Sequence, residues 1–259
     1  LKGYNVPNAS RTSKGIPVVN LLKLNKDEHV TELVPMQKDS KAEYLFFITK
    51  KGLVKRVKTQ EFDSIRNNGK IAITLRDDDE LFNVKATTGE DEIIIAGSNG
   101  KAIRFDESEI RVMGRTASGV RGFNTDGSVV VGAATSNEGT YLLSVSENGY
   151  GKKSEIDEYR KTNRGSKGVK TMNITTKTGS LVNVRAVNGD EDAMIVTDDG
   201  IIIRISLENV GVYGRNTQGV KLINVNENET VSKIAIVEKS EDEEETVEES
   251  EAAVPVNNE

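Results

Sequence analysis

Positively charged side chains recur at a nearly constant interval along this sequence. Four glycines are each followed four positions later by a cation: Gly52 by Arg56, Gly100 by Arg104, Gly149 by Lys153 and Gly200 by Arg204. Ten or eleven residues after each cation comes a second arginine: Arg66, Arg115, Arg164 and Arg215, with a fifth copy at Arg11. Guanidinium and ammonium groups bind carboxylates and phosphates through charge-assisted hydrogen bonds. The pattern therefore predicts anion binding, repeated several times along the chain.

Covalent and metal chemistry find little support in the composition. The chain has no Cys, which excludes thiol nucleophiles, disulfides and Cys-ligated metals. His29 is the one histidine, so neither a His-based metal site nor a Ser/His/Asp triad can form within the chain. There is no P-loop, and nothing marks any of the six tyrosines as a nucleophile. We expect no catalytic centre, no metal and no cofactor in this chain.

The net charge of −6 hides an uneven distribution. Residues 238–259 hold ten acidic side chains and one basic side chain, so residues 1–237 carry 34 basic against 31 acidic ones. Highly charged segments that are poor in large apolar residues do not bury enough surface to fold. We expect a weakly basic domain over residues 1–237 and an acidic, disordered tail over residues 238–259. That tail either solubilises the domain or competes with its anionic partner.

Short hydrophobic runs around the turn glycines predict β-hairpins. Four hairpins are expected over Leu45–Val57, Ile93–Phe105, Tyr141–Ser154 and Ala193–Ile205. Asn-Gly and Asp-Gly pairs at three of the turns favour type I′ geometry. A further strand-like run closes each unit: Val30–Val34, Val129–Ala133, Val182–Ala186 and Val231–Val237. Asp106–Met113 has room for one helical turn, and no segment shows a convincing helical period.

These runs give four short strands per repeat of about 50 residues, which is typical of an all-β propeller. A linear β-solenoid would have a shorter period, and a sandwich would not repeat. The WD-repeat type is disfavoured because the chain has no Trp. The second half of the repeat, which carries the second arginine, occurs five times, whereas the hairpin occurs only four times. We therefore expect an incomplete first blade, with strands missing where the N-terminal end would close the ring.

Equivalent positions in successive blades lie on one circle. The belt arginines, Arg11, Arg66, Arg115, Arg164 and Arg215, are therefore expected to form a belt, with further lysines and arginines nearby. The candidate binding residues are Arg11, Lys14, Lys55, Arg56, Arg66, Lys70, Arg104, Arg115, Arg121, Lys152, Lys153, Arg164, Lys167, Lys170, Arg204, Arg215 and Lys221. The competing interpretation is that each belt arginine pairs with a carboxylate of its own blade, namely Glu61, Glu109, Glu158 or Glu208. Net charges of +6 over residues 50–76 and 149–187 favour a long polyanion following the rim.

Duplex DNA is the polyanion that fits best. Single strands are held largely by stacking on exposed aromatic side chains, and the chain has only six Phe, six Tyr and no Trp. A duplex held by its phosphates needs only cations and backbone N–H groups. No recognition helix is visible, so little direct base readout is expected. A curved basic rim would bend the DNA that it holds.

Several motifs resemble a known family. LKGYNVPNASRTSKG, SEIRVMGRTASGVRG, SENGYGKKSEIDEYRKTNRGSKGVK and VGVYGRNTQGVKLINV resemble the C-terminal domain of the DNA gyrase A subunit, over essentially residues 1–237. The resemblance implies a six-bladed β-pinwheel whose blades exchange strands and whose perimeter wraps duplex DNA. It also implies that ATP, Mg²⁺ and the cleavage tyrosine act elsewhere in an enzyme of two A and two B subunits. The family's Gln-Arg-Arg-Gly-Gly-Lys-Gly box is missing; Asn163–Gly168 is the nearest match.

Two other interpretations remain open. The related domain of the topoisomerase IV A subunit has the same architecture, although its blades are usually more degenerate. A propeller could also act as a protein-interaction scaffold that binds partners through its faces. No apolar run approaches the roughly 20 residues of a membrane span, and there is no signal-peptide pattern. We expect a cytoplasmic protein that associates with the chromosome and not with a membrane.

Overall fold

A computed structural model describes residues 3–10, 12–22, 24–26, 28–36, 40–64, 69–226 and 229–239. Nearly all of the predicted acidic tail therefore lies outside the described residues. The innermost strands are β3 (Leu81–Thr87), β7 (Val130–Thr135), β11 (Leu181–Val187) and β15 (Val231–Val237). The hairpins are β1 (Tyr44–Thr49) with β2 (Leu53–Lys58), β4 (Glu92–Gly97) with β5 (Lys101–Asp106), β8 (Tyr141–Ser146) with β9 (Tyr150–Glu155), and β12 (Asp192–Thr197) with β13 (Ile202–Ser206). Three two-residue outer strands complete the set: β6 (Val120–Arg121), β10 (Val169–Lys170) and β14 (Val220–Lys221).

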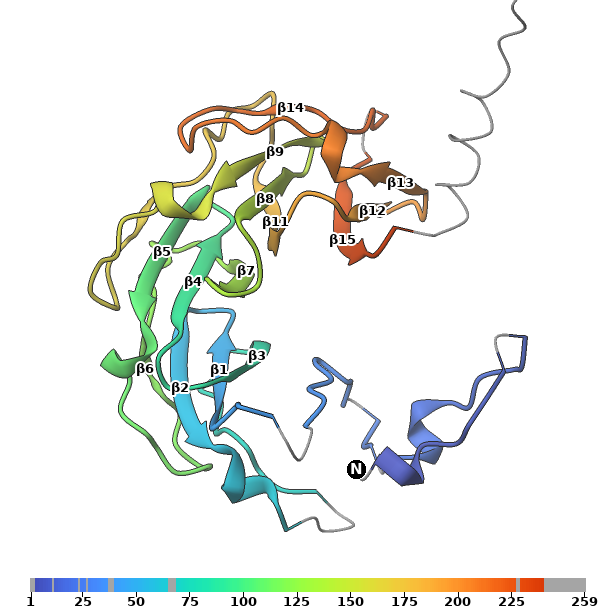
Figure 1. Ribbon diagram of the computed structural model, residues 1–259, viewed down its shortest axis with the longest axis vertical. Helices are drawn as coiled ribbons and strands as arrows, with labels where there is room; N and C mark the ends of the chain where they lie inside the picture. The colour runs from blue at the N-terminus through green and yellow to red at the C-terminus, as the bar shows by residue number, and fades with distance from the viewer. Residues whose placement is uncertain are drawn as a thin grey trace, which may run out of the picture.

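The strands of the described residues form four blades arranged in an arc (Figure 1). In strand order these are blade I (β3-β1-β2-β6), blade II (β7-β4-β5-β10), blade III (β11-β8-β9-β14) and blade IV (β15-β12-β13). Blades II and III are joined at their inner strands by a parallel bridge between Val184 and Gly132. The inner strands line the concave side of the arc, and the outer strands lie on its perimeter. The all-β pinwheel is thereby confirmed.

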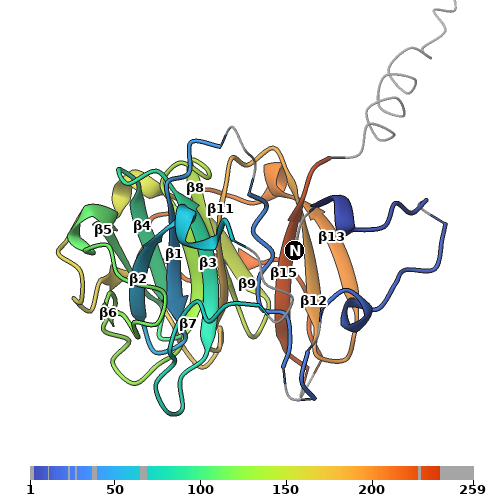
Figure 2. The same cartoon turned by 90° about the horizontal axis from the view of Figure 1, so that it is seen from below.

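Each outer strand is contributed by the following repeat. β6 follows β5 in the chain but pairs with β2, β10 follows β9 but pairs with β5, and β14 follows β13 but pairs with β9. Blade IV has no such strand within the described residues. The described parts of residues 3–36 hold two 3₁₀ turns, η1 (Gly3–Asn5) and η2 (Val18–Asn20), and lie on the open side of the arc (Figure 1). Seen from below, this blue segment extends toward the right of the view (Figure 2).

The predicted strand at Val30–Val34 is wrong, since this run forms no strand. Every inner strand of the blades pairs with a hairpin strand, as β3 does with β1. The first copy of the repeat has no hairpin beside it, so an extended run there has no ladder partner. The helical turn expected within Asp106–Met113 is confirmed as the 3₁₀ turn η4 (Glu107–Glu109).

The hydrophobic core lies between neighbouring blades. Phe46 and Val54 of blade I pack with Ile93 and Phe105 of blade II in one buried cluster. Similar clusters join blade II to blade III and blade III to blade IV. A hairpin sheet is therefore covered on both faces, which explains the nearly continuous apolar runs such as Ile93–Ala96.

The hairpin turns are not type I′, contrary to the prediction. Each loop has three or four residues, and the N–H of the turn glycine donates to the carbonyl three residues earlier, as in Gly100 to Gly97 at 3.0 Å. The four turn glycines have φ between +74° and +85°, whereas Asn99, Asn148 and Asp199 are absent from the non-glycine residues with positive φ. A type I turn followed by one left-handed residue requires glycine at that last position only.

These turn glycines also receive the exchanged outer strands. The N–H groups of Gly122, Thr171 and Leu222 donate to the carbonyls of Gly52, Gly100 and Gly149, at 3.0, 2.8 and 2.8 Å. A Cβ on Gly149 would lie 2.4 Å from the carbonyl oxygen of Ile223, so the contact leaves no room for a side chain. Gly200 lies in blade IV, where the described residues form no outer strand, and none of their atoms lies within 4 Å of the same position.

Two buried lysines hold the chain segments that lead into the exchanged strands. Lys55 Nζ donates to the carbonyls of Gly114, Arg115 and Ala117, and Lys152 Nζ donates to the carbonyl of Gly214 at 2.6 Å. Both residues are fully buried. Burial lowers the pKa of each ammonium group to about 8, and the nearby arginines Arg115 and Arg215 add to the shift.

Replacing a turn glycine tests the strand exchange. Gly149→Ala and Gly200→Ala both place alanine at positive φ, which costs about 1–2 kcal/mol. Gly149→Ala must also displace Ile223, so we expect a further loss of about 1–3 kcal/mol in the free energy of unfolding, measured by urea denaturation. Equal losses for the two variants would show that the outer strand does not press on the turn.

The buried lysines predict a dependence of stability on pH. Their folded pKa lies below the unfolded value of about 10.4, so the unfolded chain binds more protons between about pH 8 and 10. The free energy of unfolding of the wild type should therefore rise with pH in this window, relative to a Lys55→Met/Lys152→Met variant. Ile103 occupies the equivalent position in blade II, so an apolar residue fits there. Parallel pH profiles would contradict the prediction.

Candidate nucleic-acid interface

The first series of recurring cations is engaged within the fold. Arg104 contacts Glu92 at 2.5 Å through Nε and donates to the Ile156 carbonyl at 2.9 Å. Lys153 Nζ donates to the Leu207 carbonyl at 2.7 Å. These contacts join each blade to the 3₁₀ turn of the following blade, η5 (Ile156–Glu158) or η6 (Leu207–Asn209).

Arg56 and Arg204 complete this series in the outer blades. Arg56 is 8% exposed, stacks over Tyr44 at 4.6 Å and lies 3.5 Å from the buried Glu107 carboxylate. Arg204 contacts Asp192 at 2.6 Å. The charged groups of Arg56, Arg104 and Lys153, like those of Lys55 and Lys152, thus bind carbonyls or carboxylates of the fold, whereas Arg204 is exposed beside the buried Asp192. A DNA contact by any of these residues stays a prediction.

The second series, the belt arginines, links consecutive repeats. The guanidinium groups of Arg115, Arg164 and Arg215 donate to the carbonyls of Ile71, Arg121 and Lys170, at 2.9, 3.0 and 2.8 Å. Each arginine therefore connects its own repeat to the preceding one. Arg11 and Arg66 lie outside the described residues.

Carboxylates do approach the belt, but with a shift of one repeat. Arg115 Nε lies 3.6 Å from Glu61, and Arg215 Nε lies 3.8 Å from Glu158. Glu109 instead accepts the backbone N–H of Arg164 at 2.9 Å. Glu61 and Glu158, two of the predicted carboxylates, therefore do pair with belt arginines, but each pairs with the arginine of the following repeat. These long, half-exposed ion pairs contribute little stability.

A third set of cations is exposed on the perimeter. Arg121, Lys170 and Lys221 are the second residues of β6, β10 and β14, and all three side chains are exposed. They pair in register with Leu53, Lys101 and Tyr150, the residues that follow the turn glycines. In the described part of the chain, none of the three pairs with a carboxylate. We define these three residues as the perimeter cations.

Other candidates lie near the perimeter but are partly neutralised or distant. Lys167 contacts Asp126 at 2.9 Å, and Lys101 contacts the same carboxylate at 3.6 Å. The hydrogen bond from Lys167 lowers the pKa of Asp126, so this carboxylate stays ionised. Lys70 donates to the Glu61 carbonyl at 2.9 Å, and Lys14 is exposed in the N-terminal segment.

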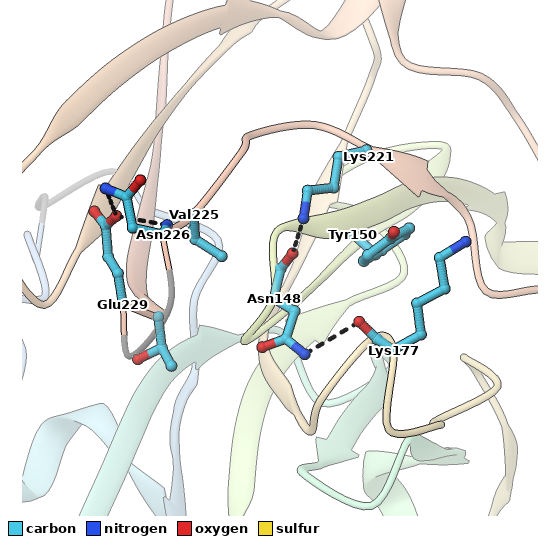
Figure 3. A pocket seen from close by; sticks show the side chains of 8 residues that line it. Asn148, Tyr150, Lys177, Lys221, Val225, Asn226 and Glu229 are labelled. Carbon is cyan, nitrogen blue, oxygen red and sulfur yellow. Dashed lines mark hydrogen bonds between the residues drawn. The ribbon is translucent and has the colours of Figure 1, made fainter.

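One cation near the perimeter was missed in the sequence. Lys177 lies on the loop between β10 and β11, with Nζ 5.2 Å from the centre of the Tyr150 ring. It lines a pocket of about 410 Å³ together with Asn148, Tyr150, Lys221, Val225, Asn226, Glu229 and Thr230 (Figure 3). Lys177 falls outside the recurring motifs, where Asp126 occupies the matching loop of the preceding repeat. A comparison of loop charges between repeats would have found it.

The arrangement is suited to binding an extended polyanion by its charge. The perimeter cations face solvent on successive blades and present donors without bound carboxylates. The described residues contain no group of three or more Asp, Glu or His side chains placed to hold a metal ion. No helix among them is long and apolar enough to cross a membrane.

Comparisons with known proteins agree with this architecture. A family model described as DNA gyrase C-terminal domain, beta-propeller, matches residues 1–35, 43–88, 91–137, 140–188 and 191–238. These five matches correspond to the N-terminal copy and to the four blades.

Similar proteins carry the same family name. The DNA gyrase A subunit of Ureaplasma parvum serovar 3 is 48% identical over 237 residues, which cover 91% of this chain and 28% of that protein. The DNA gyrase A subunit of Staphylococcus aureus (strain MRSA252) is 45% identical over 254 residues, which cover 96% of this chain and 29% of that protein. The chain thus spans less than a third of the length of these relatives.

Solved structures show the same fold. The structure of a DNA gyrase A C-terminal domain has a TM-score of 0.76 at 24% identity, over 87% of this chain and 76% of that one. The C-terminal domain of a DNA topoisomerase IV has a TM-score of 0.80 at 23% identity, over 92% and 75%. Repeat pattern, exchanged strands and family match agree, and the chain belongs to the family of DNA gyrase C-terminal β-propeller domains.

Proposed function

We propose that this chain binds duplex DNA along its perimeter and bends it. The observation that carries the proposal is the set of perimeter cations: one exposed Arg or Lys per exchanged strand, in the same register and without a carboxylate partner among the described residues. Phosphate contacts of this kind position a duplex without reading its sequence. Counterion release on such contacts makes binding strongly dependent on salt.

The curvature of the arc gives the bound DNA its bend. A duplex that contacts cations on blades I to III must follow the convex perimeter on which these side chains lie (Figure 1). Bending 20–30 base pairs by 40–90° costs on the order of 1–6 kcal/mol, which additional phosphate contacts offset. The proposed activity is therefore mechanical, and the chemistry is left to other parts of a larger enzyme.

The proposed context is DNA gyrase. The similar proteins are named as the A subunit of gyrase, which favours gyrase over topoisomerase IV. Within such an enzyme the domain would act with the rest of its own A subunit, with a second A subunit, and with two B subunits, where ATP and Mg²⁺ drive negative supercoiling. We place this assembly in the cytoplasm, on the chromosome.

Neutralising the perimeter cations tests the proposal. Binding to a duplex of about 30 base pairs should weaken steeply as the salt concentration rises. Arg121→Gln/Lys170→Gln/Lys221→Gln should reduce the magnitude of the negative slope of log K against log salt by about three. In the wild type, each of these cations releases about one counterion from the DNA when it contacts a phosphate. The measurement is fluorescence anisotropy at several salt concentrations.

The matched control removes three cations from the inner strands. Lys85, Arg185 and Lys233 lie on β3, β11 and β15, so Lys85→Gln/Arg185→Gln/Lys233→Gln gives the same change in net charge on the concave side. Its slope should match that of the wild type. A flat salt response of the wild type would favour a protein-interaction scaffold, and equal effects of the two triple variants would refute the perimeter as the binding surface.

A further inference from the structure

The loop that leads into the inner strand of blade III differs in charge from the equivalent loops of blades I and II. A loop connects each outer strand to the inner strand of the next blade, and its charged residues vary between repeats. Asp126 is the one charged residue of the loop 122–129, whereas Lys177 is the one charged residue of the loop 171–180. The loop 71–80 carries Asp77, Asp78, Asp79 and Glu80 beside Arg76. Lys177 therefore replaces an acidic residue by a basic one at this position.

The charged residue of each of these two loops contacts the residue that follows the turn glycine. In blade II, Lys101 follows Gly100 and contacts Asp126 at 3.6 Å, so the two charges compensate. In blade III, Tyr150 follows Gly149 and lies beneath Lys177, with 5.2 Å between Nζ and the ring centre. An aromatic face attracts an ammonium group without cancelling its charge. Blade III therefore keeps the positive charge that blade II neutralises.

Lys221 approaches the same ring from the outer strand. Its Nζ lies 4.9 Å from the centre of the Tyr150 ring and donates to the Asn148 carbonyl at 3.0 Å. Figure 3 shows the two lysine side chains flanking Tyr150 at the pocket. Neither ammonium pairs with a carboxylate in the part of the chain that the structure describes. Both are positioned by the ring before any ligand arrives, which lowers the entropy lost on binding.

The acidic residue of the pocket does not neutralise them. Glu229 is 4% exposed, and its carboxylate accepts hydrogen bonds from the backbone N–H and the side-chain Nδ2 of Asn226, both at 3.0 Å. In the view of Figure 3, Glu229 lies on the far side of Asn148 from Tyr150. Hydrogen bonds from Asn226 hold the pKa of the Glu229 carboxylate below its usual range, so this carboxylate is ionised. Its negative charge is held by Asn226 of the same loop and not by either lysine.

We propose that Lys177 and Lys221 form a phosphate clamp around Tyr150 that anchors the DNA backbone at blade III. This inference rests on the proposed function and adds a specific contact site to it. The ligand is a phosphodiester of the duplex, because the site offers two ammonium groups on an exposed perimeter. The amide groups of Asn148 and Asn226, which could otherwise read a base edge, already donate to the Lys177 carbonyl and to the Glu229 carboxylate. Base stacking is disfavoured because the two lysines cover the ring.

Salt-dependent duplex binding tests the clamp. Lys177→Gln should lower the slope of log K against log salt by about one, and Lys177→Gln/Lys221→Gln by about two. The matched control, Lys85→Gln/Lys233→Gln, removes the same charge from the inner strands and should leave the slope unchanged. Unaltered thermal unfolding of each variant shows that the fold persists.

A second variant separates positioning from charge. Tyr150→Leu keeps both lysines but removes the ring that orders them, so the slope should stay that of the wild type. The affinity should fall about two- to fivefold, as expected for the loss of exposed cation–π contacts. An affinity that Tyr150→Leu leaves unchanged would show that the ring does not position the two ammonium groups, and would overturn the clamp.

Ring resonances of Tyr150 in NMR spectra identify the ligand. They should shift on adding duplex to the wild type and stay unchanged in Lys177→Gln/Lys221→Gln. A shift with millimolar inorganic phosphate but none with duplex would make the pocket a site for free anions and refute the proposal. A steep wild-type slope that Lys177→Gln does not alter would refute the clamp alone. A flat wild-type slope would refute the proposed function and, with it, the clamp.

Discussion

The exchange of one strand between neighbouring repeats is the constraint on which the rest of this structure depends. Each outer strand is only two residues long, too short to hold its place by ladder hydrogen bonds alone. The carbonyl of a turn glycine and a belt arginine hold each crossing segment, and a buried lysine adds to them in blades I and III. Gly149, Lys152 and Arg215 do so around β14. Neighbouring blades are therefore joined by backbone contacts as well as by the shared core.

This constraint separates cations that build the fold from cations left for a ligand. Lys55, Lys152, Lys153 and Arg104 face inward because the crossing segments expose carbonyls that need donors. The outer strand itself has one side turned to solvent, so its second residue is exposed in each repeat. A single position, occupied by Arg121, Lys170 or Lys221, therefore repeats along the convex surface. Regular spacing of charge on the perimeter is a consequence of how the blades are joined.

Much of the fold could be predicted from the sequence, and the failures have physical causes. The four hairpins and the run Val231–Val237 agree with the structure within one or two residues, because apolar runs next to glycine turns are local signals. Asn-Gly pairs favour type I′ turns, yet the loop length selects a turn in which only the glycine needs positive φ. The burial of Lys55 and Lys153 could not be predicted, because their partners are carbonyls more than 50 residues away. The periodicity of the sequence identified the recurring cations, but it did not show which of their side chains face the interior and which face the solvent.

A topology assay on circular DNA tests most directly whether the perimeter bends what it binds. Relaxed circles are incubated with the chain, nicked and religated, and the distribution of linking numbers is compared with that of protein-free DNA. The strand-exchanged arc with its perimeter cations predicts a shift that grows with bound protein and disappears when Arg121, Lys170 and Lys221 are replaced by glutamine. An unchanged distribution with saturated DNA would show that the domain binds without wrapping, and would contradict the central claim.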